Sequence, residues 1–442
     1  MTDHGPGTAP LDPRGNAEDL AHFVTASPSS YHAVRQTARR LEAAGFVRKH
    51  ETEDFDGGPG GRYVVRDGAI VAWYTPAAAT PDQGFRIVGA HTDSPTFKVK
   101  PQSSIDRFGW HQIGVEVYGG ALLNSWLDRE LCLAGRLSLR ADDGRIEEKL
   151  VATGPVARIP QLAIHLDRSA NEGLTLDRQN HVQPVWGAGD PPSDVLGYLA
   201  AHEVNGETID PGSVTGYEIV LADTQEGRLF GQNHEFLASG RLDNLSSVHA
   251  GLEALVRASD GEAVRDETLV LAAFDHEEIG SSSRSGAAGP ILDDVLVRIA
   301  AARGGGPAEY RRALAGSVCL SADAGHLVHP NYPGHHDPVN QPKPGSGPLL
   351  KINANQRYAT DAVGAAIWAR ACESAGVGYQ EFVSNNDVPC GSTIGPITAT
   401  RLGIRTIDVG LGLLSMHSAR EMCHVEDLWA LGRALEGFYR ND

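Results

Sequence analysis

The chain has 442 residues, of which 41% are hydrophobic and 21% charged. This length favours two domains, and the composition can bury a sizeable core. The formal net charge of −18 argues against a nucleic-acid partner, because a phosphate backbone is bound through basic side chains. No apolar run approaches the roughly 20 residues that a membrane helix needs. We therefore expect a soluble protein with no membrane partner.

Residues 1–16 are polar and rich in proline and glycine, without the basic start and apolar centre of a secretion signal. We expect a short flexible leader there. Five cysteines are scattered along the chain and form no CxxC pair: Cys132, Cys319, Cys372, Cys390 and Cys423. This spacing argues against a disulfide framework and against a thiolate zinc site, and it predicts a cytoplasmic location.

The first part of the chain predicts a helix followed by strands. Within residues 17–46, a Ser-Pro-Ser-Ser sequence offers an N-cap, and Tyr31, Val34 and Leu41 then recur at near-helical spacing. Two β-branched runs follow, "RYVVRDGAIVAWYTP" and "GFRIVGAHTDSPTFKVKP". Both are typical of strands in one sheet.

From about residue 101 to 233, short strands alternate with frequent glycine and aspartate turns, which predicts an inserted β-rich module. Beyond it we predict helices at 244–258 and 358–375 and buried strands at 269–274 and 318–322. The sequence therefore predicts an α/β fold. Residues 1–100 and 234–442 form one domain in this interpretation, and residues 101–233 form the smaller insert.

Five stretches place histidine or acidic residues directly after an apolar strand: "IVGAHTDSP", "ASGRLDNL", "FDHEEIGS", "LSADAGHLVHPNY" and "LSMHSARE". Such residues can converge, because ligand-binding groups collect beyond the carboxyl ends of strands in an open α/β sheet. Each alone has an ordinary structural explanation as a turn former, cap or surface histidine. Imidazole and carboxylate together without thiolate favour a hydrolytic zinc or manganese site. The predicted set is His91, Asp243, Glu277, Glu278, Asp323 and His417.

The adjacent Glu277 and Glu278 carry the chemical argument. In a strand they would point to opposite faces, and unpaired at the edge of a core they would repel each other and lose hydration. Nearby dications would remove this penalty, so that one carboxylate binds metal while the other accepts a proton from water.

Two other hydrolase classes are less favoured. A glycosidase needs carboxyl groups roughly 5 to 9.5 Å apart on both sides of the scissile bond, which sequence neighbours rarely achieve. A two-metal phosphatase is disfavoured by the acidic net charge and by the lack of an arginine-rich clamp around these stretches.

Over nearly the whole chain after the leader, the sequence resembles the M18 family of metalloaminopeptidases, which includes the aspartyl aminopeptidases. The matching stretches, in order, are "GAHTDSPTFKVKP", "IPQLAIHL", "SGRLDNL", "DHEEIGS", "SADAGHLVHPNY", "KINANQRYATD", "DVPCGSTIGP" and "MHSAREM". The resemblance implies a zinc-peptidase-like α/β/α sandwich as the catalytic domain, interrupted by a smaller β-rich dimerisation domain.

The resemblance also implies two divalent metal ions per subunit, zinc or alternatively manganese or cobalt. Five residues would bind them, with Asp243 as the bridge: His91 and Asp323 on one side, Glu278 and His417 on the other. Glu277 would be the general acid/base, and Asp93 would orient the His91 imidazole. A hydroxide held between the ions would attack the first peptide bond of the substrate.

Acidic N-terminal residues are the expected substrates, because Lys351 resembles the family lysine that meets an acidic side chain. His326 and Tyr358 match other pocket positions. Without the resemblance, Lys351 would be interpreted as a solvated strand end, and a preference for neutral, leucine-like residues is the alternative.

Assembly is implied by the resemblance alone. The histidine that corresponds to His165 reaches into the active site of a neighbouring subunit, and the family forms dodecamers built from dimers. An inactive assembly or binding protein on the same scaffold is the remaining alternative. It is disfavoured because all six metal and base positions are intact.

Overall fold

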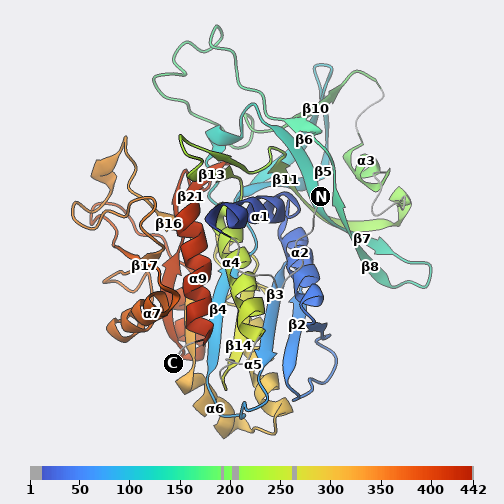
Figure 1. Ribbon diagram of the computed structural model, residues 1–442. Coiled ribbons are helices and arrows are strands. Elements are labelled where there is room, and N and C mark those ends of the chain that lie inside the picture. The colour runs from blue at the N-terminus through green and yellow to red at the C-terminus, as the bar shows by residue number, and fades with distance from the viewer. Residues whose placement is uncertain (1–11, 191–193, 202–208, 261–265, 441–442) are drawn as a thin grey trace.

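The computed structural model describes residues 12–190, 194–201, 209–260 and 266–440. Figure 1 shows a central sheet with helices on both faces, and a second, β-rich part at the top. No helix within these ranges is both long and apolar enough to cross a membrane.

The central sheet has nine strands in the described residues. In spatial order they are β1 (Val47–Arg48), β2 (Gly60–Arg66), β3 (Ala69–Thr75), β14 (Thr268–Phe274), β4 (Phe85–His91), β15 (Val318–Ala322), β19 (Arg405–Gly410), β17 (Leu349–Lys351) and β18 (Gln380–Phe382). The four strands β14, β4, β15 and β19 run parallel to one another. Their carboxyl ends therefore meet at one edge of the sheet.

Helices cover both faces because the inner strands are apolar on both sides. Leu269 and Leu271 of β14 pack into one core, whereas Val270 and Phe274 pack into the other. The first core is covered by α1 (Pro13–Thr25), α2 (Ser30–Ala43), α4 (Leu242–Ser259), α7 (Ala362–Ala375) and α9 (Val425–Arg440). The second is covered by α5 (Ile291–Ala302), α6 (Pro307–Gly316) and α8 (Ile394–Leu402). The fold is the expected α/β/α sandwich.

A second sheet of seven strands forms the β-rich part. Its members are β11 (Val214–Asp223), β5 (Thr96–Arg107), β6 (Trp110–Tyr118), β10 (Val185–Ala188), β9 (Ala157–Arg158), β7 (Glu130–Arg140) and β8 (Ile146–Ala152). Strand β11 pairs with both β5 and β7, so the sheet closes on itself. Helix α3 (Val195–Ala201) contributes Val195 and Leu199 to its core.

A third sheet has five strands in the described residues, and all of them come from residues 228–424. It contains β12 (Arg228–Phe230), β13 (Phe236–Ser239), β21 (Glu421–His424), β20 (Gly412–Leu414) and β16 (Gly325–His326). Strand β12 lies within the predicted insert, 101–233, but it pairs with β13, which lies outside it. The predicted start of the insert, residue 101, lies inside β5, where the register shifts between Val99 and Ser104. Pro101 marks this irregularity and does not end the strand.

The predicted helix ends need two corrections. Helix α1 begins at Pro13 because Asp12 caps it by accepting from the Gly15 amide, so the predicted leader is wrong for residues 13–16. Residues 1–11 lie outside the described ranges. The predicted helix at 358–375 begins only at Ala362, because Asp361 is its N-cap. The helix predicted after the Ser-Pro-Ser-Ser stretch is confirmed as α2, capped by Ser29.

A polar network joins the three helices α1, α2 and α4. The Arg40 guanidinium lies 2.7 Å from Asp19 Oδ2 and 3.4 Å from Glu253 Oε1, and His249 Nε2 lies 2.6 Å from Asp19 Oδ2. Burial acts to raise the pKa of Asp19, but His249 and Arg40 together hold it well below its usual value. The carboxylates and imidazole are grouped as metal ligands could be, yet Arg40 already supplies their positive charge.

We expect Asp19→Asn to lower the free energy of unfolding at pH 7 by about 1–3 kcal/mol, because charged hydrogen bonds to Arg40 and His249 are lost. The folded-state pKa lies below the unfolded value of about 4. The stabilisation is therefore present above about pH 4 and is lost as the pH falls through the folded pKa. Urea unfolding of both proteins at pH 7 and at successively lower pH measures it.

Glu18→Gln is the matched control, since Glu18 pairs with Arg14 on the exposed side of the same helix and a surface pair contributes little. Equal destabilisation by the two substitutions would contradict the prediction.

Candidate metal centre

Four of the predicted residues follow strands of the central sheet. His91 is the last residue of β4, and Asp323 directly follows β15. Glu277 and Glu278 lie in a short 3-10 turn, η3 (Glu277–Ile279), just beyond the end of β14. Because β4, β14 and β15 are parallel, these four side chains meet at one edge of the sheet.

The other two come from the smaller five-stranded sheet. Asp243 lies at the start of α4, shortly after β13, and His417 lies in the turn between β20 and β21. The strands that precede them in the chain, β13 and β20, both pair antiparallel with β21. The sequence interpretation placed all six residues beyond the strands of one open sheet, and this was wrong for Asp243 and His417.

The two oxygens of Asp243 face different histidines. Oδ1 is 3.4 Å from His91 Nε2, and Oδ2 is 3.2 Å from His417 Nε2. Asp323 Oδ1 lies 3.6 Å from His91 Nε2, and Glu278 Oε2 lies 3.5 Å from His417 Nε2. Two compact groups of ligand atoms result, and Asp243 belongs to both.

Carboxylates crowd this edge, and their pKa values reflect it. Burial, followed by the charge of Asp243, raises the pKa of Glu278 well above its usual value. Burial and nearby carboxylates raise the pKa of Glu277 to about 7, although His91 opposes this. Burial acts to lower the pKa of His91, but the nearby carboxylates of Asp243, Asp323 and further acids raise it. The protein part of the centre therefore carries an excess of negative charge, which favours bound cations.

The residues present fit a divalent metal. Asp243 Oδ1 and Glu278 Oε1 are buried and accept no hydrogen bond from the described residues. Buried anionic oxygens without a donor or cation are costly. A set of imidazoles and carboxylates without thiolate is the donor set of hydrolytic zinc sites and also accepts manganese.

Asp93 holds both glutamates and one histidine in place. Its carboxylate accepts from the backbone amides of Glu277 at 3.1 Å and Glu278 at 3.2 Å, and from the Tyr118 hydroxyl at 2.7 Å. His91 Nδ1 lies 3.1 Å from the Asp93 carbonyl oxygen and 3.4 Å from Oδ1. The sequence predicted only the contact with His91.

The predicted strand geometry of the two glutamates is wrong. Strand β14 ends at Phe274, and His276 adopts a left-handed conformation with φ 63°. The chain then turns, so that the backbone amides of Glu277 and Glu278 can both donate to Asp93. In a strand, two successive amides would point in opposite directions. Glu277 keeps 17% of its side chain exposed, whereas Glu278 keeps 3%.

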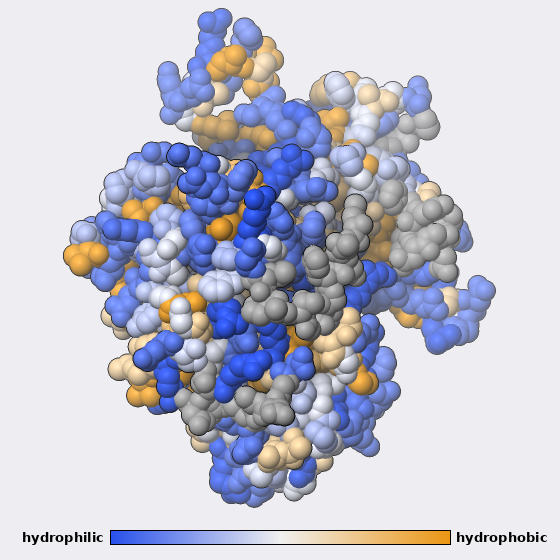
Figure 2. All heavy atoms as spheres, in the orientation of Figure 1, coloured by the Kyte–Doolittle hydropathy of each residue, from blue (hydrophilic) through white to orange (hydrophobic). Residues whose placement is uncertain are grey.

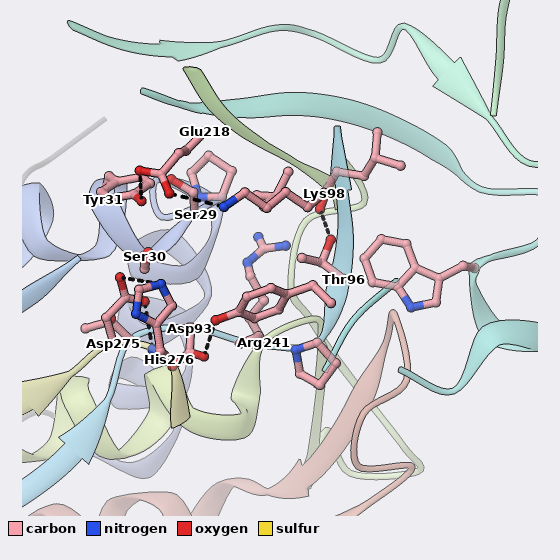
Figure 3. Close-up of a pocket in the computed structure, with 18 residues that line it drawn as sticks. Ser29, Ser30, Tyr31, Asp93, Thr96, Lys98, Glu218, Arg241, Asp275 and His276 are labelled. Carbon is pink, nitrogen blue, oxygen red and sulfur yellow. Dashed lines mark hydrogen bonds and ion pairs between the residues drawn. The ribbon is translucent and has the colours of Figure 1, made fainter. Parts of the chain in front are cut away.

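Asp93 also lines a small pocket of about 60 Å³ that reaches toward the β-rich part. Figure 3 shows Asp93, Asp275 and His276 on one side of this pocket, and Lys98 paired with Glu218 on another. The distance from Lys98 Nζ to Glu218 Oε1 is 3.1 Å. The pocket thus joins the residues around the metal centre to strands β5 and β11.

Three of the four predicted substrate-binding residues lie together near Asp323. Lys351 Nζ lies 5.1 Å from the ring centroid of Tyr358. Phe382 connects the group, with ring centroids 6.2 Å from Tyr358 and 6.3 Å from His326. These three residues and Phe382 therefore form one cluster, which Lys351 connects to Asp323.

Lys351 is fully buried, with 0% of its surface exposed, so it is not a solvated strand end. Its ammonium donates to the carbonyl oxygens of Asp323 at 2.8 Å and Ala324 at 3.1 Å. It also lies 4.0 Å from Asp323 Oδ2. Asp323 is a metal-ligand candidate. A second buried carboxylate, Asp408, also lies within reach of this charge, because burial raises the pKa of Asp408 and Lys351 acts to lower it.

His165 is not brought to the centre by its own chain. It is exposed and lies in the loop between β9 and β10, which extends at the top of Figure 1. Leu162, Ile164 and Leu166 beside it are also exposed.

One residue close to the centre was missed. Glu421 lies four positions after His417 in the stretch "LSMHSARE" and is only 2% exposed. Its carboxylate contacts the backbone of both Asp243 and His417. The sequence carried one signal for Glu421: it is an acidic residue at the start of a short strand, "EMCH", whose side chains pack against the fold.

Comparison with known proteins shows which family the chain belongs to. The sequence profile of the M18 peptidase family, described as "Aminopeptidase I zinc metalloprotease (M18)", matches residues 23–439. A "Probable M18 family aminopeptidase 2" of Streptomyces avermitilis is 53% identical and covers 96% of this chain and 98% of its own length. A protein of the same name from Pseudomonas entomophila is 45% identical, with coverages of 96% and 97%.

Solved structures agree as well. The matching chain of the "Ape4 and Nbr1 complex" has a TM-score of 0.93 at 37% identity and covers 97% of this chain and 86% of its own. Yeast aminopeptidase 1 has a TM-score of 0.84 at 29% identity, with 97% of both chains covered. The chain therefore belongs to the M18 family of aminopeptidases, the aminopeptidase I zinc metalloproteases.

Proposed function

We propose that this aminopeptidase removes acidic N-terminal residues from peptides and holds two divalent metal ions, zinc by preference. One observation carries the proposal: the two oxygens of Asp243 face His91 and His417 at 3.4 and 3.2 Å. A carboxylate placed between two imidazoles in this way can bridge two ions.

The proposed ligand sets follow from the distances. Asp243 is shared, and the pairs that complete the two sets are His91 with Asp323, and Glu278 with His417. When bound, two such ions supply Lewis acidity, which polarises a substrate carbonyl and lowers the pKa of a water molecule.

Glu277 is the proposed general acid/base. Its Oε2 lies 4.0 Å from His91 Nε2, at the outer side of the ligand cluster, and its side chain is the more exposed of the two glutamates. Asp93 fixes its backbone through the amide. Glu277 would take a proton from the attacking water and deliver it to the leaving amine.

Substrate preference rests on the buried charge of Lys351. Two carbonyl dipoles, a carboxylate oxygen of Asp323 4.0 Å away and the buried Asp408 act on its ammonium. The side-chain carboxylate of an acidic first residue would be a further anionic partner of this charge, with Tyr358 and His326 as walls of the pocket. The full burial of Lys351 favours a second candidate, in which it only supports Asp323 and neutral residues are preferred.

The assembly state is also part of the proposal. The solved mApe1 of S. cerevesiae is described as a dodecamer, and we extend this to a dodecamer built from dimers for the present chain. The predicted insert, residues 101–233, would be the dimerisation domain, and the closed sheet of residues 96–223 would form most of it. The exposed His165 would then complete the site of a neighbouring subunit. The five free cysteines support a cytoplasmic location.

Glu278→Gln and Glu277→Gln should separate metal binding from proton transfer. We expect Glu278→Gln to lose zinc on dialysis, because one ligand of the His417 side is weakened. Glu277→Gln should keep two zinc ions per subunit, with kcat lowered about 10²- to 10⁴-fold. Zinc content and hydrolysis of an aspartyl anilide measure the two effects. Full activity of Glu277→Gln would contradict the mechanism.

Lys351→Met should lower kcat/KM for an aspartyl anilide by about 100-fold, because one buried charge pair of about 2.7 kcal/mol is lost. The rate for a leucyl anilide should change little. Lys351→Arg keeps the charge in a larger side chain, so it separates the loss of charge from a change of shape at this buried position.

If Lys351 only supports Asp323, both rates fall by the same factor. Equal wild-type rates on the two substrates would also exclude the acidic preference. The zinc-loaded proteins are compared at one zinc concentration.

A further inference from the structure

Glu421 connects Asp243 and His417, which belong to the same group of candidate metal ligands. It is the first residue of β21, and its Oε2 accepts from the backbone amide of Asp243 at 3.0 Å. Its Oε1 accepts from the backbone amide of His417 at 2.8 Å. One buried carboxylate thus holds the main chain at Asp243 and at His417.

The surrounding fold explains this position. Strand β21 pairs with β13 so that Glu421 lies opposite Ser239, and the chain passes from Ser239 through two residues to the start of α4. On the other side, His417 lies in the turn before β21 with φ 65°, and its Nδ1 is 3.2 Å from the Gly120 carbonyl oxygen. Without the Glu421 bridge, the turn and the helix start could shift relative to each other.

By holding both backbones, Glu421 sets the distance between two of the candidate metal ligands, Asp243 and His417. Asp243 Oδ2 and His417 Nε2 lie 3.2 Å apart, and Glu278 Oε2 lies 3.5 Å from the same nitrogen. A ligand displaced by a fraction of an ångström loses much of its affinity, because residues that orient ligands are worth 10- to 100-fold in metal binding.

The chemistry requires a carboxylate at this position. Two backbone N–H donors need two acceptor oxygens, and an ionised glutamate provides both. A glutamine provides one oxygen and would point its NH₂ group at the second N–H donor. An aspartate is one methylene shorter than glutamate and cannot reach both amides without movement.

The charge also points to cations. Glu421 is a buried acid beside Asp243, which already lies among carboxylates, so its ionised form adds one more negative charge there. Such a charge is costly in a purely structural role, but it strengthens the attraction of the site for dications.

We propose that Glu421 is a positioning residue that sets the metal affinity of the Asp243, Glu278 and His417 group. The proposal rests on the proposed function, since it assumes that ions bind there. It adds a carboxylate that binds no metal itself and acts through the backbone of two ligands.

The test is a zinc titration of the metal-free full-length protein against a competing chromophoric chelator. We expect Glu421→Gln to keep one tight zinc and to weaken the second by about 10- to 100-fold. His417→Ala should weaken the same zinc, and Asp323→Ala the other one. Glu436→Gln is the matched control, because Glu436 of α9 is also a buried glutamate but pairs with Arg257 of α4.

A second readout separates positioning from general stability. The metal-free Glu421→Gln protein should still unfold in one cooperative thermal transition, although the hydrogen bond to one backbone amide is lost. Its kcat should recover in excess zinc, with KM unchanged. Glu421→Asp keeps the charge and should still weaken the second zinc, because it reaches only one amide.

Wild-type affinity for both zinc ions in a folded Glu421→Gln protein would overturn the proposal. A lowered melting temperature with unchanged zinc affinity would overturn it as well, by assigning Glu421 a structural role only. Failure of the proposed function looks different: a wild-type protein that binds two zinc ions but cleaves no N-terminal residue contradicts the activity and leaves the titration result valid.

Discussion

Repulsion among buried carboxylates is the constraint around which this protein is organised. Asp243, Glu277, Glu278 and Asp323 crowd one edge of the central sheet, and burial raises the pKa of both glutamates. The fold tolerates such a cluster only where positive charge compensates it. Two histidines supply part of that compensation, and dications are the natural supply of the rest.

Two further acids at the same edge, Asp93 and Glu421, position the backbone instead of facing the ions. Neither needs to touch an ion, and each uses both carboxylate oxygens to hold backbone amides of ligand residues or of Glu277. Asp93 fixes the turn that carries the two glutamates, and Glu421 fixes Asp243 against His417. The main chain at the centre is therefore held by charged hydrogen bonds, which are stronger than neutral ones. This rigidity suits a site whose ligands come from two different sheets.

Lys351 links the metal centre to the proposed substrate pocket. Its ammonium lies behind Asp323 and beside the Tyr358 ring, so one positive charge can influence both a metal ligand and the first residue of a substrate. Catalysis and specificity are then coupled in space. The β-rich part approaches the same region through Tyr118 and the pocket around Asp93.

The sequence by itself determined the α/β class, the buried strands, the family and the metal-ligand candidates, because strand periodicity and ordered motifs are local properties. It identified His91, Asp243, Glu278, Asp323 and His417 as one set, and the structure brings them together. Only the tertiary structure decided that Asp243 and His417 arrive from a second sheet, that the paired glutamates lie in a capped turn, and that Lys351 is fully buried. Strand pairing and burial depend on contacts between residues far apart in the chain, and one such contact, from Glu421 to Asp243, spans 178 positions.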